Sequence, residues 1–274
     1  MGEDEMGHIP KKINELLGTY FDSLELKAPN LLEGYYLYGS ASLGAFKYGV
    51  SDIDFIAVIN RKLTDIDVNI LKEIHKNMQR KYPKASLDGF YITENDLVSL
   101  NSGSISGVYF NDGKFNGYKE FCKNSIDAYQ LKKYGITIKG QNIEEHFYSI
   151  DWNILINNMK NNLNTYWFGW WIGCKKFPSF NYIGLLFSIH MVEWGVLGVS
   201  RLYYTFNEKD ITSKVGAGEY ALKVVPQRWH KIINESLRLR NGNKKSLYKS
   251  VFKRRKDALD YIEFMIKNCN NLFQ

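Results

Sequence analysis

The chain has 274 residues, of which 45% are hydrophobic, so it can bury a substantial core and is not a disordered protein. Its net charge of +7 is local, because nine basic residues and no acid lie between Arg238 and Lys256. The rest of the chain therefore carries −2, which is the total of +7 less these nine. We interpret the run as a solvated helix face, so nucleic acid and anionic membranes are not expected partners.

The cysteines Cys122, Cys174 and Cys269 are far apart and show no C-x-x-C spacing, which argues against a disulfide framework or a zinc site. The acidic N-terminus has no apolar segment, so no signal peptide is expected. The most apolar long stretch, residues 182–204, contains a histidine, a glutamate and an arginine, and this favours a buried helix over a membrane span. We expect a cytoplasmic protein.

The first elements of the chain are a helix and a short strand. Apolar residues at helical spacing predict a helix over 10–26, which covers one face of a sheet. A β-rich run over 33–38 then ends at Gly39 and Ser40. Gly39 allows close approach of the backbone and Ser40 adds a hydroxyl beside exposed amides, so together they are suited to holding phosphates.

A second strand begins with two aspartates that are separated by one residue. Side chains alternate along a strand, so Asp52 and Asp54 point to the same face. Residues 55–59 are all apolar, which is typical of a central strand covered on both sides. Two carboxylates at the end of such a strand need a cation, and hard oxygen ligands suit Mg²⁺ bound with substrate phosphates. Either motif alone also fits a plain turn or strand end, but the pair favours a nucleotide-handling enzyme.

A strand–helix–strand order follows these aspartates. Thr64 is predicted to cap a helix that Pro83 ends, and residues 86–93 are strand-like with Asp88 near their start. This order implies a covered sheet in which Asp88 lies beside the first two aspartates. Asp88 is therefore a candidate third carboxylate for a metal site, although a strand-edge aspartate before a turn fits the sequence equally well.

These motifs carry a family resemblance. The G-S at 39–40, Gly44 and the S-D-I-D at 51–54 resemble the signature of the polymerase-beta-type nucleotidyltransferase superfamily. Within it, the L-Y-G-S-A at 37–41 with Lys47 is most similar to the streptomycin/spectinomycin adenylyltransferases. The resemblance implies a Mg²⁺-dependent enzyme that uses ATP.

The resemblance also implies roles for single residues. Asp52 and Asp54 would hold Mg²⁺, while Gly39, Ser40 and Ser51 would position phosphate oxygens.

Asp88 departs from the family pattern, which has a glutamate implicated as general base at this place. The shorter side chain leaves both roles open, that of a metal ligand with Asp52 and Asp54 and that of the base.

The remainder of the first domain contains a loop, a helix and an edge strand. Residues 101–117 are rich in Gly, Ser and Asn and predict a long loop, of a length often found in functional lids. A helix over 125–134 and a short strand over 135–140 follow. We place the end of a nucleotidyltransferase domain at residue 149, so that residues 150–274 form a second domain.

The second half shows only helical patterns, which predict a bundle. The resemblance carries Arg201 and Lys214 over as residues that reach the nucleotide phosphates. An ion pair within the bundle for Arg201 and a solvated side chain after an N-cap turn for Lys214 are the alternatives. The expected helices are 151–174, 181–206, 212–224, 226–238 and 245–268.

Together these features predict an α+β fold, in which a small mixed sheet precedes a helical bundle and the substrates lie in the cleft between the domains. The expected reaction transfers AMP from ATP to a hydroxyl of an aminoglycoside or aminocyclitol antibiotic. A tRNA or protein acceptor, or a silent nucleotide-binding module, are the alternatives. A cationic acceptor would be met by carboxylates and aromatic faces, for which the candidates are Glu193, Trp170, Trp171 and Trp194. The alternative is that the tryptophans, at least two of them, belong to the core. The oligomeric state is left open by the sequence.

Overall fold

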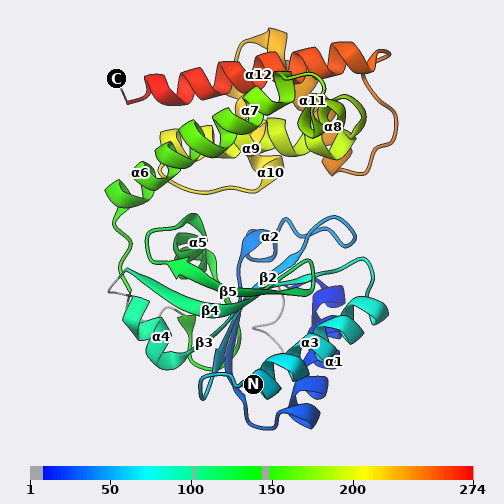
Figure 1. The fold of residues 1–274 in the computed structure, drawn as a ribbon. Coiled ribbons are helices and arrows are strands. Elements are labelled where there is room, and N and C mark those ends of the chain that lie inside the picture. The colour runs from blue at the N-terminus through cyan, green and yellow to red at the C-terminus, as the bar shows by residue number, and fades with distance from the viewer. Residues whose placement is uncertain (1–8, 101–102, 144–147, 274) are drawn as a thin grey trace. The chain divides into compact units, whose positions relative to one another are not determined.

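The computed structural model describes residues 9–100, 103–143 and 148–273. The chain forms two compact units, of which the first ends at Trp152 and the second starts at Asn153 (Figure 1). The sequence places the boundary a few residues earlier, after residue 149.

The first unit is built on a six-stranded sheet with the order β5-β4-β3-β2-β1-β6. Strands β2 and β3 are parallel and the other neighbouring strands are antiparallel, so the predicted mixed sheet is confirmed. The strands are β1 (Leu32–Leu37), β2 (Ile53–Ile59), β3 (Leu87–Thr93), β4 (Ser104–Asn111), β5 (Lys114–Cys122) and β6 (Ile136–Lys139).

Helices cover both faces of this sheet (Figure 1). Helices α1 (Lys11–Lys27) and α3 (Asp65–Lys81) bury their apolar stripes against one face, around the ring of Phe55. Helices α4 (Glu94–Ser99) and α5 (Ile126–Tyr134) pack on the other face. Because β2 is covered on both sides, its continuous apolar run is explained.

The crossover from β2 to β3 was predictable in detail. Thr64 caps α3 in a capping box with Asp67, whose carboxylate also binds Arg61 at 2.5 Å. The helix ends before Pro83, and β3 then lies parallel to β2 with Asp88 opposite Asp54. The predicted approach of these two aspartates is therefore confirmed.

The loop predicted over residues 101–117 is wrong. Residues 101 and 102 lie outside the described part of the chain, but β4 and β5 form an antiparallel hairpin. Its turn is Asp112-Gly113, with φ of 51° and 64°, and consecutive left-handed residues match the twist of a hairpin. Ser104 and Ser106, two of the small polar residues that suggested a loop, lie at exposed positions of β4 that alternate with the buried Ile105 and Gly107.

The second unit consists of helices, as predicted, but two of them are interrupted. A π-helical turn over Leu163–Trp167 separates α6 from α7, and Ser188 ends α8 and caps α9. The single helix predicted over 181–206 is therefore wrong, because its apolar pattern runs through the break. The helices are α6 (Trp152–Asn162), α7 (Phe168–Lys175), α8 (Phe180–Phe187), α9 (Ile189–Glu208), α10 (Lys214–Val224), α11 (His230–Arg240) and α12 (Val251–Asn271).

Among the described residues, no single helix has both the length and the apolar character for a membrane span. The successive helices α8 and α9 meet these criteria only when taken together, and they are bent by 98° at their junction.

The solvated basic face predicted over residues 238–256 is wrong for its arginines. Glu235 is completely buried and accepts hydrogen bonds from Arg238, from the hydroxyl of Ser246 and from the amide of Leu247. Arg254 is also buried, with Nη1 4.0 Å from the same carboxylate. Burial alone would raise the pKa of Glu235, but these donors hold it below its usual value.

Candidate active site

The turn after β1 brings a glycine against an aspartate. Gly39 has φ +65° and begins the short helix α2 (Gly39–Ser42). A Cβ atom at this position would lie 1.7 Å from Oδ2 of Asp54, so only glycine fits. The hydroxyl of Ser40 is buried and has no hydrogen-bond partner in the described part of the chain. This turn therefore offers a buried polar hydroxyl beside a carboxylate.

Three carboxylates converge at the edge of the sheet where β2 and β3 begin. Asp52, Asp88 and Asp112 each place one oxygen within 4.8 Å of the others. Asp88 is buried, whereas Asp52 and Asp112 are exposed. Such hard oxygen donors fit Mg²⁺ in number and chemistry.

Asp112 was missed by the sequence analysis, which placed it in a loop. The Asp-Gly dipeptide between two alternating runs is the signal that would have found the hairpin turn. The same turn touches Asp88, because the amide of Gly113 donates to Oδ1 of Asp88 at 3.3 Å. The hydroxyl of Ser86 donates to the same oxygen. Asp88 is thus held in place by the residue that precedes β3 and by the hairpin.

Two of the predicted residues lie near this cluster with other contacts. Asp54 is half-buried on β2 and, among the described residues, is not a member of the three-carboxylate group. Ser51 is buried, and its hydroxyl accepts a hydrogen bond from the amide of Lys47 at 3.1 Å. Ser51 therefore orders the connector that leads into Asp52.

Burial and nearby carboxylates both raise the pKa of two tyrosines around the site. Burial raises the pKa of the half-buried Tyr109 to about 12, with the carboxylate of Asp88 contributing to the shift. Burial likewise raises the pKa of Tyr38, with Asp127 and Asp54 adding to the shift. A site of this charge favours a bound cation.

A cavity lies at the edge of the sheet that carries the three carboxylates. This cavity of about 250 Å³ is lined by Ser51, Asp52, Ser86 and Asp112, together with Gln79 of α3 and residues of the turn that follows this helix.

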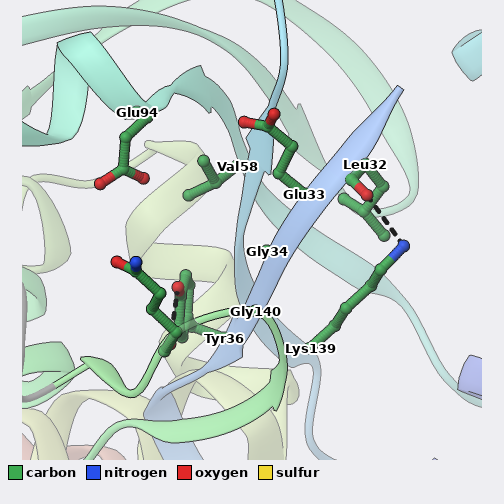
Figure 2. A pocket seen from close by; sticks show the side chains of 9 residues that line it. Leu32, Glu33, Gly34, Tyr36, Val58, Glu94, Lys139 and Gly140 are labelled. Atoms are coloured by element: carbon green, nitrogen blue, oxygen red, sulfur yellow. Dashed lines mark hydrogen bonds between the residues drawn. The ribbon is translucent and has the colours of Figure 1, made fainter. Parts of the chain in front are cut away.

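A larger cavity of about 470 Å³ lies at the opposite end of β1, where Glu33, Glu94 and Lys139 line it (Figure 2). There the Lys139 ammonium donates to the carbonyl of Leu32 at 2.8 Å. The cavity is thus at the far end of the strand from Gly39 and separate from the carboxylate cluster.

The two cations predicted to bind phosphate lie on neighbouring helices of the second unit. Arg201 is half-buried on α9, and Lys214 is the first residue of α10, which Ser213 caps. Lys214 Nζ lies 3.7 Å from Oε1 of Glu193, so its charge is balanced in part by a buried carboxylate.

Two of the four side chains expected to meet a cationic acceptor are buried inside the second unit. Glu193 is buried between cations, and Trp171 is buried with its indole N–H donating to the carbonyl of Leu259 at 3.2 Å. Trp194 stacks on Trp167 with ring centroids 4.5 Å apart. Glu193 and Trp171 therefore serve packing and ion pairing.

Comparison with known proteins is consistent with this geometry. Residues 191–268 match the family described as "Aminoglycoside adenylyltransferase, C-terminal domain". The chain is 22% identical over 281 residues to a spectinomycin 9-adenylyltransferase of Campylobacter jejuni, covering 98% of both proteins. The chain is thus similar to the aminoglycoside adenylyltransferases. The family resemblance and the enzyme class predicted from the sequence are thereby confirmed.

A solved relative shows the same fold. The crystal structure of a spectinomycin adenyltransferase from Enterococcus faecialis, determined with ATP and spectinomycin, superposes with a TM-score of 0.67. It is 17% identical, and the match covers 93% of this chain and 99% of that one. The α+β architecture predicted from the sequence is thus confirmed.

Proposed function

We propose that this chain is a Mg²⁺-dependent enzyme that transfers AMP from ATP to a hydroxyl of an aminocyclitol or aminoglycoside antibiotic. Spectinomycin is the first candidate acceptor, because the curated relative is named for it and the solved relative was crystallised with it. The observation that carries the proposal is the convergence of Asp52, Asp88 and Asp112 at one edge of the sheet. A cytoplasmic location belongs to the proposal and agrees with three free cysteines.

The aspartates are assigned to metal and proton chemistry. Asp52, Asp54 and Asp88 would hold Mg²⁺, and Asp112 adds a fourth carboxylate to that edge. When bound, Mg²⁺ neutralises charge on the phosphates and on the leaving pyrophosphate. Either Asp88 supports the metal or its carboxylate takes the proton of the attacking hydroxyl. In both cases Ser86 and Gly113 fix its orientation.

The transfer forms a bond between the acceptor oxygen and the α-phosphorus of ATP. It breaks the bond between this phosphorus and the oxygen that bridges the α- and β-phosphates. The acceptor proton goes to a carboxylate, and pyrophosphate leaves. Gly39 and Ser40 are assigned to phosphate oxygens because the glycine has no side chain and the buried Ser40 hydroxyl has no described partner. Arg201 and Lys214 are assigned to the nucleotide phosphates as charge-assisted donors.

A macromolecular acceptor is disfavoured by the structure of the basic run. Its only support in the sequence was the charge between residues 238 and 256. Arg238 and Arg254 are engaged by the buried carboxylate of Glu235, which leaves mainly exposed lysines for such a partner.

The experiment is pyrophosphate release from ATP and Mg²⁺ with a panel of aminoglycosides, aminocyclitols, tRNA and protein. We expect release with at least one antibiotic, and loss of release in Asp52→Asn and Asp54→Asn proteins that remain folded. An Asp54→Asn enzyme with near-wild-type turnover would contradict the assigned metal site. Release with tRNA or protein alone would move the acceptor to the macromolecular class.

A further inference from the structure

The turn that carries Ser40 is held by a side chain from a distant helix. Gln130 lies on α5, which packs beside α2 (Figure 1). Its amide Nε2 donates to the carbonyl of Gly39 at 2.5 Å and to Oγ of Ser42 at 3.3 Å. Ser42 Oγ donates to the same carbonyl at 3.2 Å. One side chain thus binds two residues of the turn that precede it by 91 and 88 positions.

The next two carbonyls of α2 are bound by the chain that directly follows them. The carbonyl of Ser40 accepts from the amide of Ala45 at 2.9 Å, and the carbonyl of Ala41 accepts from the amide of Gly44 at 3.2 Å. These local bonds shape the turn but do not tie it to α5. Glycine adopts positive and negative φ about equally, so Gly39, with φ +65°, does not hold its own carbonyl in one direction. The donor from α5 supplies that restraint.

The direction of the Gly39 carbonyl decides where the next amide points. The peptide bond between Gly39 and Ser40 is trans and planar, so its C=O and N–H point in opposite directions. A donor that holds the carbonyl toward α5 therefore turns the N–H of Ser40 away from α5. The hydroxyl of the same serine is buried and has no hydrogen-bond partner among the residues that the structure describes. Gln130 thus fixes the backbone beside an unused buried hydroxyl.

Gln130 occupies a position where an apolar side chain would be expected. Only 2% of Gln130 is exposed, and the other buried residues of α5, Ala128 and Leu131, are apolar. Burying an amide costs free energy unless the amide is hydrogen-bonded. The carbonyl of Gly39 and the hydroxyl of Ser42 provide these bonds, so the glutamine is explained by the turn that it binds.

We propose that Gln130 is a positioning residue for the phosphate-binding turn, which fixes the peptide between Gly39 and Ser40 so that Ser40 can bind phosphate oxygens of ATP. This inference rests on the proposed function, because Gly39 and Ser40 are assigned there to phosphate. If the peptide were reversed, the carbonyl oxygen of Gly39 would take the place of the Ser40 N–H and repel the phosphates. Gln130 itself acts through the turn and does not contact ATP.

The test compares Gln130→Met with a matched control, Tyr148→Phe, in the full-length protein. Methionine is an unbranched side chain of similar length that lacks the amide donor. The Tyr148 hydroxyl donates to the carbonyl of Ala128 on α5 at 2.8 Å, so the control loses a buried hydrogen bond that does not involve the turn. Ser42→Ala is a second variant, which removes the other donor to the Gly39 carbonyl.

Three quantities are measured for each protein. Calorimetry in the presence of Mg²⁺ gives the dissociation constant of ATP. Displacement of ATP gives that of tripolyphosphate, which has the phosphates of ATP without the nucleoside. The melting temperature without ligand reports stability.

We expect Gln130→Met and Tyr148→Phe both to melt at a lower temperature than the wild type, because each loses a buried hydrogen bond. Gln130→Met should also weaken the binding of ATP and of tripolyphosphate by about three- to tenfold. Ser42→Ala should weaken both ligands less, because its hydrogen bond is longer and lies within the turn. Tyr148→Phe should bind both ligands as the wild type does.

Wild-type affinity for ATP in Gln130→Met, or an equal loss of affinity in Tyr148→Phe, would overturn the inference and make Gln130 purely structural. Weaker ATP binding with unchanged tripolyphosphate binding would overturn it too, because the effect would then lie outside the phosphates. If Gln130→Met does not fold, wild-type affinity in Ser42→Ala overturns the inference. The proposed function would still stand if the wild type released pyrophosphate with an antibiotic. A wild-type protein that bound no ATP would overturn both.

Discussion

At the scale of single residues, Gly39 shows how backbone and catalytic chemistry are linked. Its left-handed φ and the Asp54 carboxylate that occupies the place of a side chain both require glycine. The sequence predicted a glycine that allows close approach of a phosphate. The structure shows that the close neighbour is Asp54, so the glycine sets the position of a proposed metal ligand.

Gly39→Ala should therefore cost more than backbone strain alone. Gly44→Ala is the matched control, because Gly44 has a similar φ of +63° and a Cβ added there would meet no atom within 4 Å. We expect both substitutions to lower the free energy of unfolding by about 1–2 kcal/mol for the left-handed residue. Gly39→Ala should lose about 1–3 kcal/mol more through the clash, together with its transfer activity. Urea denaturation measures the free energy of unfolding, and pyrophosphate release measures the transfer activity. Equal losses of stability and activity in the two variants would contradict the placement of Asp54.

At the scale of elements, the β4–β5 hairpin places Asp112 beside Asp52 and Asp88. Asp112→Asn should weaken the binding of Mn²⁺, used as a spectroscopic substitute for Mg²⁺, by about tenfold without unfolding the protein. Glu120→Gln, an exposed acid on β5, is the control and should bind as the wild type does. Electron paramagnetic resonance titration measures the free ion. Equal Mn²⁺ affinity in the two variants would exclude Asp112 from the metal site.

The elements also show what the sequence could and could not predict. Helix α3 was predictable because Thr64 and Pro83 mark its ends locally. The hairpin was not predicted, because its small polar residues resemble a loop in composition and hid the turn signal of Asp112-Gly113. The partner of Arg238 was equally hidden, since the carboxylate of Glu235 is fixed only when the following loop folds back through Ser246 and Leu247.

At the scale of the whole molecule, two compact units each contribute part of the proposed chemistry. The first carries the carboxylates and the second carries Arg201 and Lys214. The signature residues at 39–54 were sufficient to predict the enzyme class, because metal and phosphate chemistry is concentrated in a short stretch. The residues that contact the acceptor could not be predicted, because Glu193 and Trp171, two of those expected to meet it, are buried inside the second unit. The position of a charged side chain in a bundle depends on packing that no local pattern encodes.

The most direct test of the central claim is the chemical identity of the product. The purified protein is incubated with ATP, Mg²⁺ and spectinomycin, and the antibiotic is then analysed by mass spectrometry, with the other aminocyclitols and aminoglycosides in parallel. We predict an antibiotic that carries one AMP group on a hydroxyl, with one pyrophosphate released for each antibiotic modified. Recovery of every antibiotic unmodified, from a protein that binds ATP, would contradict the proposed function.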